Sequence, residues 1–126
     1  MRKRIKLIDR RLPDYSKGEE IMNMVTHITG GALGIAALVL CVVRAALRGG
    51  AVDVVGAVIY GVSLIGLYTM SSVYHGLRPG MGKKVLQVLD HCTIYFLIAG
   101  SYTPFCLITL QGTLGWTLCI AEWVLA

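Results

Sequence analysis

Charged residues are scarce in this sequence, and they are not spread evenly along it. Only 15% of the 126 residues are Asp, Glu, Lys or Arg, against 56% that are hydrophobic, and the mean hydropathy is +0.68. An average soluble domain carries about 25% charged residues. The charges gather at the head of the chain and in short gaps, and the stretches between them are nearly uncharged. This segregation predicts insertion into a membrane.

The sequence also lacks the cysteine spacing of a zinc finger or a redox motif. Its four cysteines are far apart, and each lies in or beside an apolar run: Cys41, Cys92, Cys106 and Cys119. Without a CxxC pair, neither class of site is indicated. We expect these residues to be small, buried apolar side chains within helices.

The net charge of +5 does not indicate a nucleic-acid-binding protein, because the basic residues gather at the head of the chain. Seven of them precede the first apolar run: Arg2, Lys3, Arg4, Lys6, Arg10, Arg11 and Lys17. A basic head beside an apolar helix is typical of a cytoplasmic flank that is attracted to anionic lipid. The aromatic and basic interleaving of single-strand binders is missing. We therefore expect contacts with membrane lipids and none with nucleic acid.

The head also lacks the features of a cleaved signal peptide. It carries four acidic residues before the apolar core: Asp9, Asp14, Glu19 and Glu20. No small-residue cleavage site closes a short apolar region. Even if the head served as a signal anchor, the first helix would remain in the membrane.

Four apolar segments organise the chain. They span residues 21–47, 51–77, 85–110 and 114–126. A membrane-spanning helix needs roughly 20 apolar residues, and the short gaps at 48–50, 78–84 and 111–113 require neighbouring helices to run antiparallel. We predict an all-α, polytopic transmembrane bundle, with a basic cytoplasmic segment over 1–18 and a helical domain over 19–126.

The last apolar segment is short. It has 13 residues between Leu114 and Ala126, fewer than the roughly 17–25 of a comfortable span, and no polar tail follows it. We interpret the chain as a fragment of a longer bundle. The alternative is a short natural protein with a half-inserted last helix, whose unsatisfied backbone groups would be costly in lipid.

Basic residues also predict the orientation. Arg78, Lys83 and Lys84 lie in the second gap, whereas the first connection carries only Arg44 and Arg48. The positive-inside rule therefore places the N-terminus and the 78–84 loop in the cytoplasm. We expect a multi-pass protein of the plasma membrane.

Glycines recur within the apolar segments. Gly30 and Gly34 form a GxxxG step in the first, and Gly56, Gly61 and Gly66 recur in the second. None belongs to a phosphate-binding loop pattern. Small residues of this kind let membrane helices approach closely, so we predict close packing at these positions.

Seven polar residues mark the apolar segments at one membrane depth. They are Glu20, Asn23 and His27 at the first segment, Ser71 and His75 in the second, and Asp90 and His91 in the third. The spacings within the first two segments put these side chains on one helical face. The predicted topology brings all seven toward the cytoplasmic side. Ionisable groups at membrane depth usually face the bundle interior and serve a function.

Imidazole and carboxylate together are suited to zinc, but the number of ligands falls short. A catalytic zinc ion usually has three protein ligands and a water. The sequence offers His75, Asp90 and either His27 or His91, with no HxxxH or HExxH pair. The alternative is an interhelical hydrogen-bond network. From the helix geometry we expect the side-chain ends of His75 and Asp90 to lie about 4–8 Å apart, with Ser71 on the same side.

Three blocks of the sequence resemble the hemolysin III family. They are GEEIMNMVTH at 18–27, SSVYH at 71–75 and DHCTIYFLIAGSYTPF at 90–105. That family is grouped with the progestin and adipoQ receptors, and more distantly with the alkaline ceramidases. The resemblance covers the chain from about Gly18 onward, and the third block is the most specific of the three.

The resemblance implies a seven-helix bundle with a cytoplasmic N-terminus and a zinc site near that side. His75 would be a zinc ligand, with Ser71 and Asp90 beside the metal-bound water. The family's remaining ligands belong to an HxxxH block on the last helix, which has no counterpart here. Glu20, Asn23 and His27 match a block typical of the bacterial branch.

Two functions from different classes follow. The first is a zinc-dependent membrane hydrolase of an amide-bonded lipid, in which Asp90 acts as a base or orients water. The second is a non-enzymatic sensor or cytolytic factor whose zinc is structural. An open metal position facing a lipid-accessible cavity would favour the enzyme, and a zinc ion fully ligated by protein would favour the second.

Overall fold

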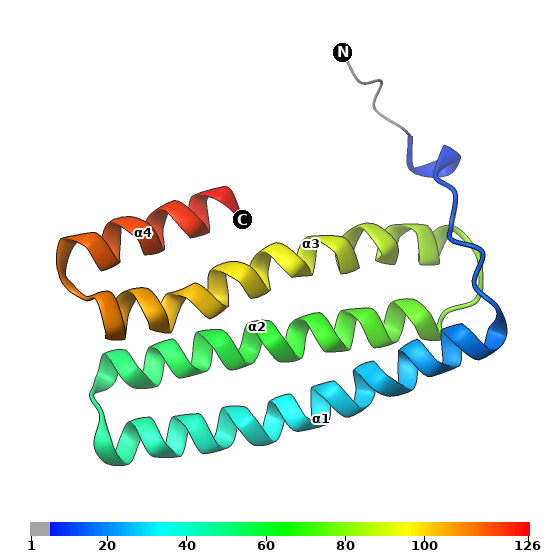
Figure 1. Ribbon diagram of the computed structural model, residues 1–126. Coiled ribbons are helices and arrows are strands. Elements are labelled where there is room, and N and C mark those ends of the chain that lie inside the picture. The colour runs from blue at the N-terminus through cyan, green and yellow to red at the C-terminus, as the bar shows by residue number, and fades with distance from the viewer. Residues whose placement is uncertain (1–5) are drawn as a thin grey trace.

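The computed structural model describes residues 6–126, so the predicted basic residues Arg2, Lys3 and Arg4 lie outside the described part. In chain order the elements are η1 (Leu7–Asp9), α1 (Lys17–Arg48), α2 (Ala51–Gly76), α3 (Met81–Pro104), the π-helical η2 (Phe105–Leu110) and α4 (Gly112–Leu125) (Figure 1). Every element in this part of the chain is helical. This confirms the all-α prediction.

Three helical stretches are long and apolar enough to cross a membrane. They are Lys17–Arg48, Ala51–Gly76 and Met81–Leu110, while α4 is apolar but shorter. At about 1.5 Å per residue, the 32 residues of α1 extend about 48 Å. A hydrocarbon core is only about 30 Å thick, so the ends of α1 reach beyond it. The protein is therefore an integral membrane protein.

The start of α1 is set by a capping box. The backbone N–H of Glu19 donates to the Ser16 hydroxyl oxygen over 3.3 Å, and the Glu19 carboxylate accepts from the Ser16 N–H over 2.7 Å. These bonds satisfy backbone donors that the first helical turn leaves free. The helix therefore begins at Lys17, four residues before the predicted apolar segment, and Glu20 lies in its first turn.

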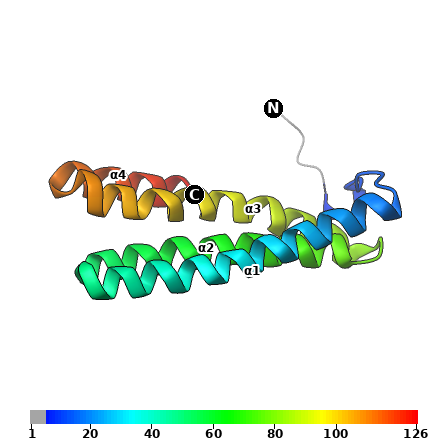
Figure 2. The same ribbon diagram turned by 60° about the horizontal axis from the view of Figure 1, so that its bottom comes forward.

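The helices run antiparallel, side by side. Figure 1 shows α1, α2 and α3 in sequence order, with α4 folding back along the far half of α3. Figure 2 shows that α3 and α4 lie to one side of the α1–α2 pair. The N-terminal segment and the connection between α2 and α3 lie at the same end of the bundle, which agrees with the predicted alternation of direction.

Close approach of α1 and α2 depends on glycine at two points. A methyl group added at Gly61 would lie 2.8 Å from Cβ of Leu38, and one added at Gly30 would lie 2.6 Å from the Tyr68 ring. The predicted close packing is found at both positions. At Gly66 it is wrong, because nothing lies within 4 Å of an added methyl group.

The third span continues beyond Pro104 with a changed backbone pitch. Pro104 has no N–H to donate, and the next six residues form a π-helix to Leu110, so the predicted helical segment to 110 holds with a wider last part. Gln111 and Gly112 then take positive φ values of 52° and 58° and reverse the chain. The Trp123 indole N–H donates to the Thr103 hydroxyl over 2.9 Å and fastens α4 to α3.

The predicted loop at 78–84 is too long. Met81 already begins α3, so Lys83 and Lys84 belong to the first helical turn and only residues 77–80 connect the helices. The sequence predicted Lys83 to lie in the cytoplasmic 78–84 loop. Its side chain is instead buried, with 3% exposure, because it faces Glu20 of α1.

The glycine contacts predict opposite effects for two similar substitutions. Gly61→Ala should lower the free energy of unfolding by about 1–3 kcal/mol, since the new methyl overlaps the stem of Leu38. Gly66→Ala should leave it unchanged or raise it by up to about 1 kcal/mol, because alanine favours helix more than glycine. Thermal unfolding of both variants in detergent tests this. Equal shifts would contradict the packing described for Gly61.

Candidate functional site

The polar cluster at the N-terminal end of the bundle is centred on Glu20. One carboxylate oxygen, Oε2, lies 2.6 Å from Nδ1 of His75, and the other, Oε1, lies 2.5 Å from Nζ of Lys83. The three side chains come from α1, α2 and α3. Glu20 therefore joins the first three helices through one carboxylate.

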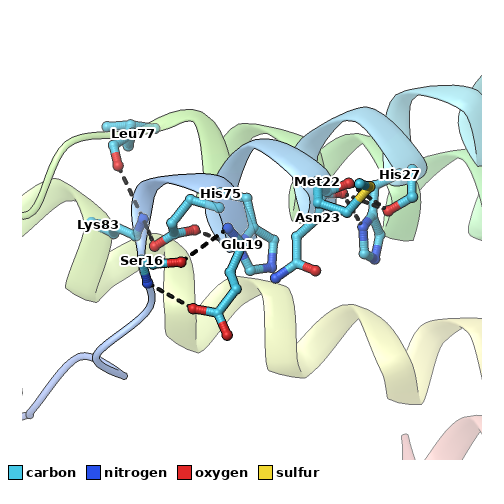
Figure 3. Close-up of polar contacts among 10 residues, drawn as sticks. Ser16, Glu19, Met22, Asn23, His27, His75, Leu77 and Lys83 are labelled. Carbon is cyan, nitrogen blue, oxygen red and sulfur yellow. Dashed lines mark hydrogen bonds and ion pairs between the residues drawn. The ribbon is translucent and has the colours of Figure 1, made fainter.

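Lys83 is a buried cation whose donors are used. Besides Glu20, its ammonium donates to the backbone carbonyl of Leu77 over 3.1 Å (Figure 3). It also lies 5.1 Å from the centroid of the Tyr74 ring, within the range of a cation–π interaction. A buried charge is tolerated only when it is paired and hydrogen-bonded, and Lys83 meets both conditions.

The contacts of Glu20 determine the proton position on His75. An ionised carboxylate is only an acceptor, and Glu20 is ion-paired with Lys83. The proton in the His75–Glu20 bond must therefore belong to Nδ1 of the imidazole. In the neutral ring, Nε2 then carries a free lone pair. Among the described residues, no hydrogen bond reaches that nitrogen.

Aromatic rings surround His75. The centroid of its ring lies 4.7 Å from that of Tyr74, 5.8 Å from that of His27 and 5.9 Å from that of Tyr15. These rings come from α2, α1 and the N-terminal segment. Only 9% of the His75 side chain is exposed, so the free nitrogen lies in a largely closed aromatic environment.

Two further predicted residues of α1 lie next to this cluster. Nδ1 of His27 is 2.6 Å from the backbone carbonyl oxygen of Asn23 (Figure 3), and the His27 ring meets the Tyr68 ring edge-on at 5.8 Å between centroids. His27 is thus oriented by its own helix, with Nε2 left as its second nitrogen. Asn23 contributes its backbone carbonyl to this arrangement.

The predicted residues of α2 and α3 are placed differently from one another. Ser71 is buried at 5% exposure, one turn before His75, and Asp90 is half-buried in α3. His91 is exposed, and its Nδ1 lies 2.6 Å from the Gln87 carbonyl of its own helix. The structure therefore does not bring His91 into the Glu20 cluster. The 4–8 Å separation between His75 and Asp90 stays a prediction.

Among the described residues, His75 has the surroundings of a single zinc ligand. Proteins commonly support a metal-ligating histidine by bonding its second nitrogen to a carboxylate, and Glu20 stands in that relation to His75. Over residues 6–126, however, no group of three or more His, Cys, Asp or Glu side chains is arranged to hold a metal ion. The described residues therefore do not complete a zinc site by themselves.

The N-terminal segment is held across the start of α3. Arg10 Nε donates to the side-chain carbonyl of Gln87 over 2.8 Å, and Lys84 Nζ donates to the Ile8 carbonyl over 2.5 Å. Gln87 is buried at 5% exposure. These bonds keep the segment on the bundle, next to the ring contact between Tyr15 and His75.

Sequence reasoning missed Lys83, Gln87 and Tyr15. A usable signal was present for two of them, because Lys83 and Gln87 are four residues apart and share one face of α3. Two polar residues on one face at the start of an apolar helix indicate a polar neighbour. No local pattern pointed to Tyr15, since its contact with His75 joins residues 60 positions apart.

The helices and their buried polar cluster define a polytopic α-helical membrane protein with a charged site at one end of the bundle. Residues 15–126 match the family described as "Haemolysin-III related". The chain belongs to this haemolysin III family.

Two Bacillus proteins illustrate the similarity. The chain is 47% identical to Hemolysin-3 of Bacillus cereus over 116 residues, which cover 92% of the chain and 52% of that protein. It is also 47% identical to a Hemolysin-3 homolog of Bacillus subtilis (strain 168) over 108 residues, covering 86% and 51%. The chain thus spans about half the length of these curated relatives. No solved structure matches it.

The burial of Lys83 predicts a large difference between two adjacent lysines. Lys83→Ala removes the cation from Glu20, and we expect a loss of about 2–3 kcal/mol in unfolding free energy. That is below the roughly 3–5 kcal/mol of a fully buried pair, because Glu20 keeps 19% exposure. Lys84→Ala removes one bond to a carbonyl and should cost about 1 kcal/mol or less. Unfolding in detergent compares them, and equal losses would count against the buried pair.

Proposed function

We propose that this chain forms part of a zinc-dependent intramembrane hydrolase that cleaves an amide-bonded lipid. The observation that carries the proposal is His75, a largely enclosed imidazole with a carboxylate on Nδ1 and a free lone pair on Nε2. That arrangement is how a zinc ligand is prepared. The remaining ligands would come from residues other than those described.

The neighbouring residues suit the same chemistry. A bound zinc ion polarises an amide carbonyl and makes water nucleophilic near neutral pH. Nε2 of His75 would hold the ion, the Asp90 carboxylate would accept a proton from the attacking water, and the Ser71 hydroxyl would orient that water. The burial of Ser71, one turn before His75, supports a role inside the bundle rather than at the lipid surface.

The position of the site in α1 supports access by a lipid. Glu20 is in the first turn of α1, and α1 is longer than the hydrocarbon core, which supports a location of the cluster toward the headgroup region. A scissile amide near a lipid headgroup would meet His75 there. We propose that the membrane is the plasma membrane and that this end faces the cytoplasm, as the basic residues around it indicate.

The names of the two Bacillus relatives favour a second candidate. Both are called hemolysin-3, which points to a cytolytic factor, and a non-enzymatic sensor belongs to the same class. In either case the zinc ion would be structural and fully ligated by protein. The enzyme requires an open coordination position for water.

The zinc content of purified protein tests the proposed zinc site at His75. The whole protein, purified in detergent, should contain about one zinc ion per chain by mass spectrometry, and His75→Ala should lose most of it. His91→Ala should keep it, because that imidazole lies outside the cluster. A wild-type protein free of zinc, or His75→Ala with full zinc content, would refute the site.

The same preparation separates the two candidate functions. Asp90→Asn should keep the zinc and lose hydrolysis of a ceramide by at least about 100-fold, the lower range for a general base. If the wild type does not hydrolyse lipid amides but lyses erythrocytes, and Asp90→Asn lyses them equally well, the cytolytic candidate is correct.

Impermeant thiol labelling tests the orientation. In a variant whose four cysteines are replaced by serine, Arg48→Cys should react with a membrane-impermeant reagent added outside intact cells. Gly80→Cys, at the α2–α3 connection, should react only after the cells are opened. Both residues are exposed, so burial does not distinguish them. The reverse pattern would invert the proposed topology.

A further inference from the structure

We propose that Glu20 is the positioning residue for His75, and that Lys83 holds Glu20 in the orientation this requires. Glu20 would keep the proton on Nδ1 and so present Nε2 as the donor atom. The consequence for metal affinity rests on the proposed function. The consequence for the His75 tautomer rests only on the contacts of these three side chains.

The two oxygens of Glu20 serve two different donors. Oε2 accepts from His75 and Oε1 accepts from Lys83. Glutamine has nearly the same shape but offers one acceptor oxygen and one NH₂ group. In a Glu20→Gln variant, the single amide oxygen should remain on the Lys83 ammonium, because an NH₂ group there would face a buried cation. The NH₂ group then faces Nδ1 of His75, and the Nδ1–H bond is lost.

Lys83 restricts the carboxylate from the opposite side. Its ammonium also donates to the Leu77 carbonyl, which lies just past the end of α2, two residues after His75. Lys83 therefore fixes Glu20 relative to the helix that carries His75. Its positive charge also balances the carboxylate, which leaves His75 free to be the neutral imidazole that a metal requires.

The opposing interpretation is a structural ion pair that only joins the helices. In that case substitutions at Glu20 would lower stability without changing the properties of His75. A positioning role predicts that the tautomer and the metal affinity change together, in protein that is still folded. It also predicts that Lys83 acts only through Glu20.

The chain provides matched controls for both residues. Glu19 carries the same charge one position earlier, but it bonds only to Ser16 at the surface. Lys84 carries the same charge one position after Lys83, and it bonds to the Ile8 carbonyl. Glu19→Gln and Lys84→Met repeat the chemical changes of Glu20→Gln and Lys83→Met away from His75.

The experiment uses the whole protein in detergent, with two measurements on each variant. The first is the ¹⁵N spectrum of labelled histidines in metal-free protein, in which His75→Gln identifies the His75 signal. Wild type, Glu19→Gln and Lys84→Met should show a proton fixed on Nδ1. Glu20→Gln should lose that pattern. Glu20→Asp, which keeps two acceptor oxygens, should restore part of it.

The second measurement is the zinc dissociation constant. Glu20→Gln should weaken binding about 10–100-fold, as is typical when the supporting partner of a ligand is removed. Lys83→Met should weaken it less, and the double variant should be no worse than Glu20→Gln alone, since contacting residues of one network are not additive. The two control variants should bind as the wild type does.

The outcomes separate this inference from the proposed function. Folded Glu20→Gln with wild-type His75 signals would overturn the inference, whatever the zinc result. A wild type that binds no zinc would overturn the proposed function, while the tautomer measurement would still decide the role of Glu20. If Glu20→Gln does not fold, Glu20→Asp and Lys83→Met decide it, and unchanged His75 signals in both would refute it.

Discussion

The cost of burying charge between helices at one end of the bundle governs this structure. Lys83 is almost fully enclosed, and an isolated ammonium ion would not be stable there. Glu20 provides the compensating charge, and its second oxygen is available to His75. Because these residues lie on three helices, satisfying one buried cation also fixes the relative position of α1, α2 and α3. The predicted zinc ligand is held by the same contacts.

The sequence was a good guide to the fold because the bilayer imposes simple rules. Long uncharged runs must be helical when they cross a membrane, and the gap at 48–50 marked the turn between α1 and α2 closely. The errors were at helix ends. The Ser16–Glu19 capping box begins α1 at Lys17, and its S-x-x-E pattern was readable in the sequence. The first turn of α3 was mistaken for loop, because a pair of lysines beside glycine and proline resembles a solvated flank.

The candidate site was predicted in part, and the missing part has a physical reason. Helical spacing predicted Ser71 and His75 on one face of α2, and the turn at 77–80 brings the ends of α2 and α3 together. The ion pair between Glu20 and Lys83 joins residues 63 positions apart. No periodicity within one helix reveals such a pair, since it depends on how two helices are rotated about their axes. His91 shows that neighbours in sequence need not share a site. It follows Asp90 directly, and successive residues of a helix point about 100° apart around its axis.

Glu20 and Lys83 are both hydrogen-bonded within the described part of the chain, whereas Nε2 of His75 is not. No fully buried side-chain nitrogen or oxygen in the described part of the chain lacks a hydrogen-bond partner, so the contacts among these helices compensate the polar atoms that they enclose. Metal binding would then select a conformation already present rather than create it, which lowers the ordering cost of binding. Zinc is by contrast essential for folding in small domains that have no packed core of their own. The charges of Glu20 and Lys83 neutralise each other, and the same contacts leave Nε2 of His75 without a hydrogen bond.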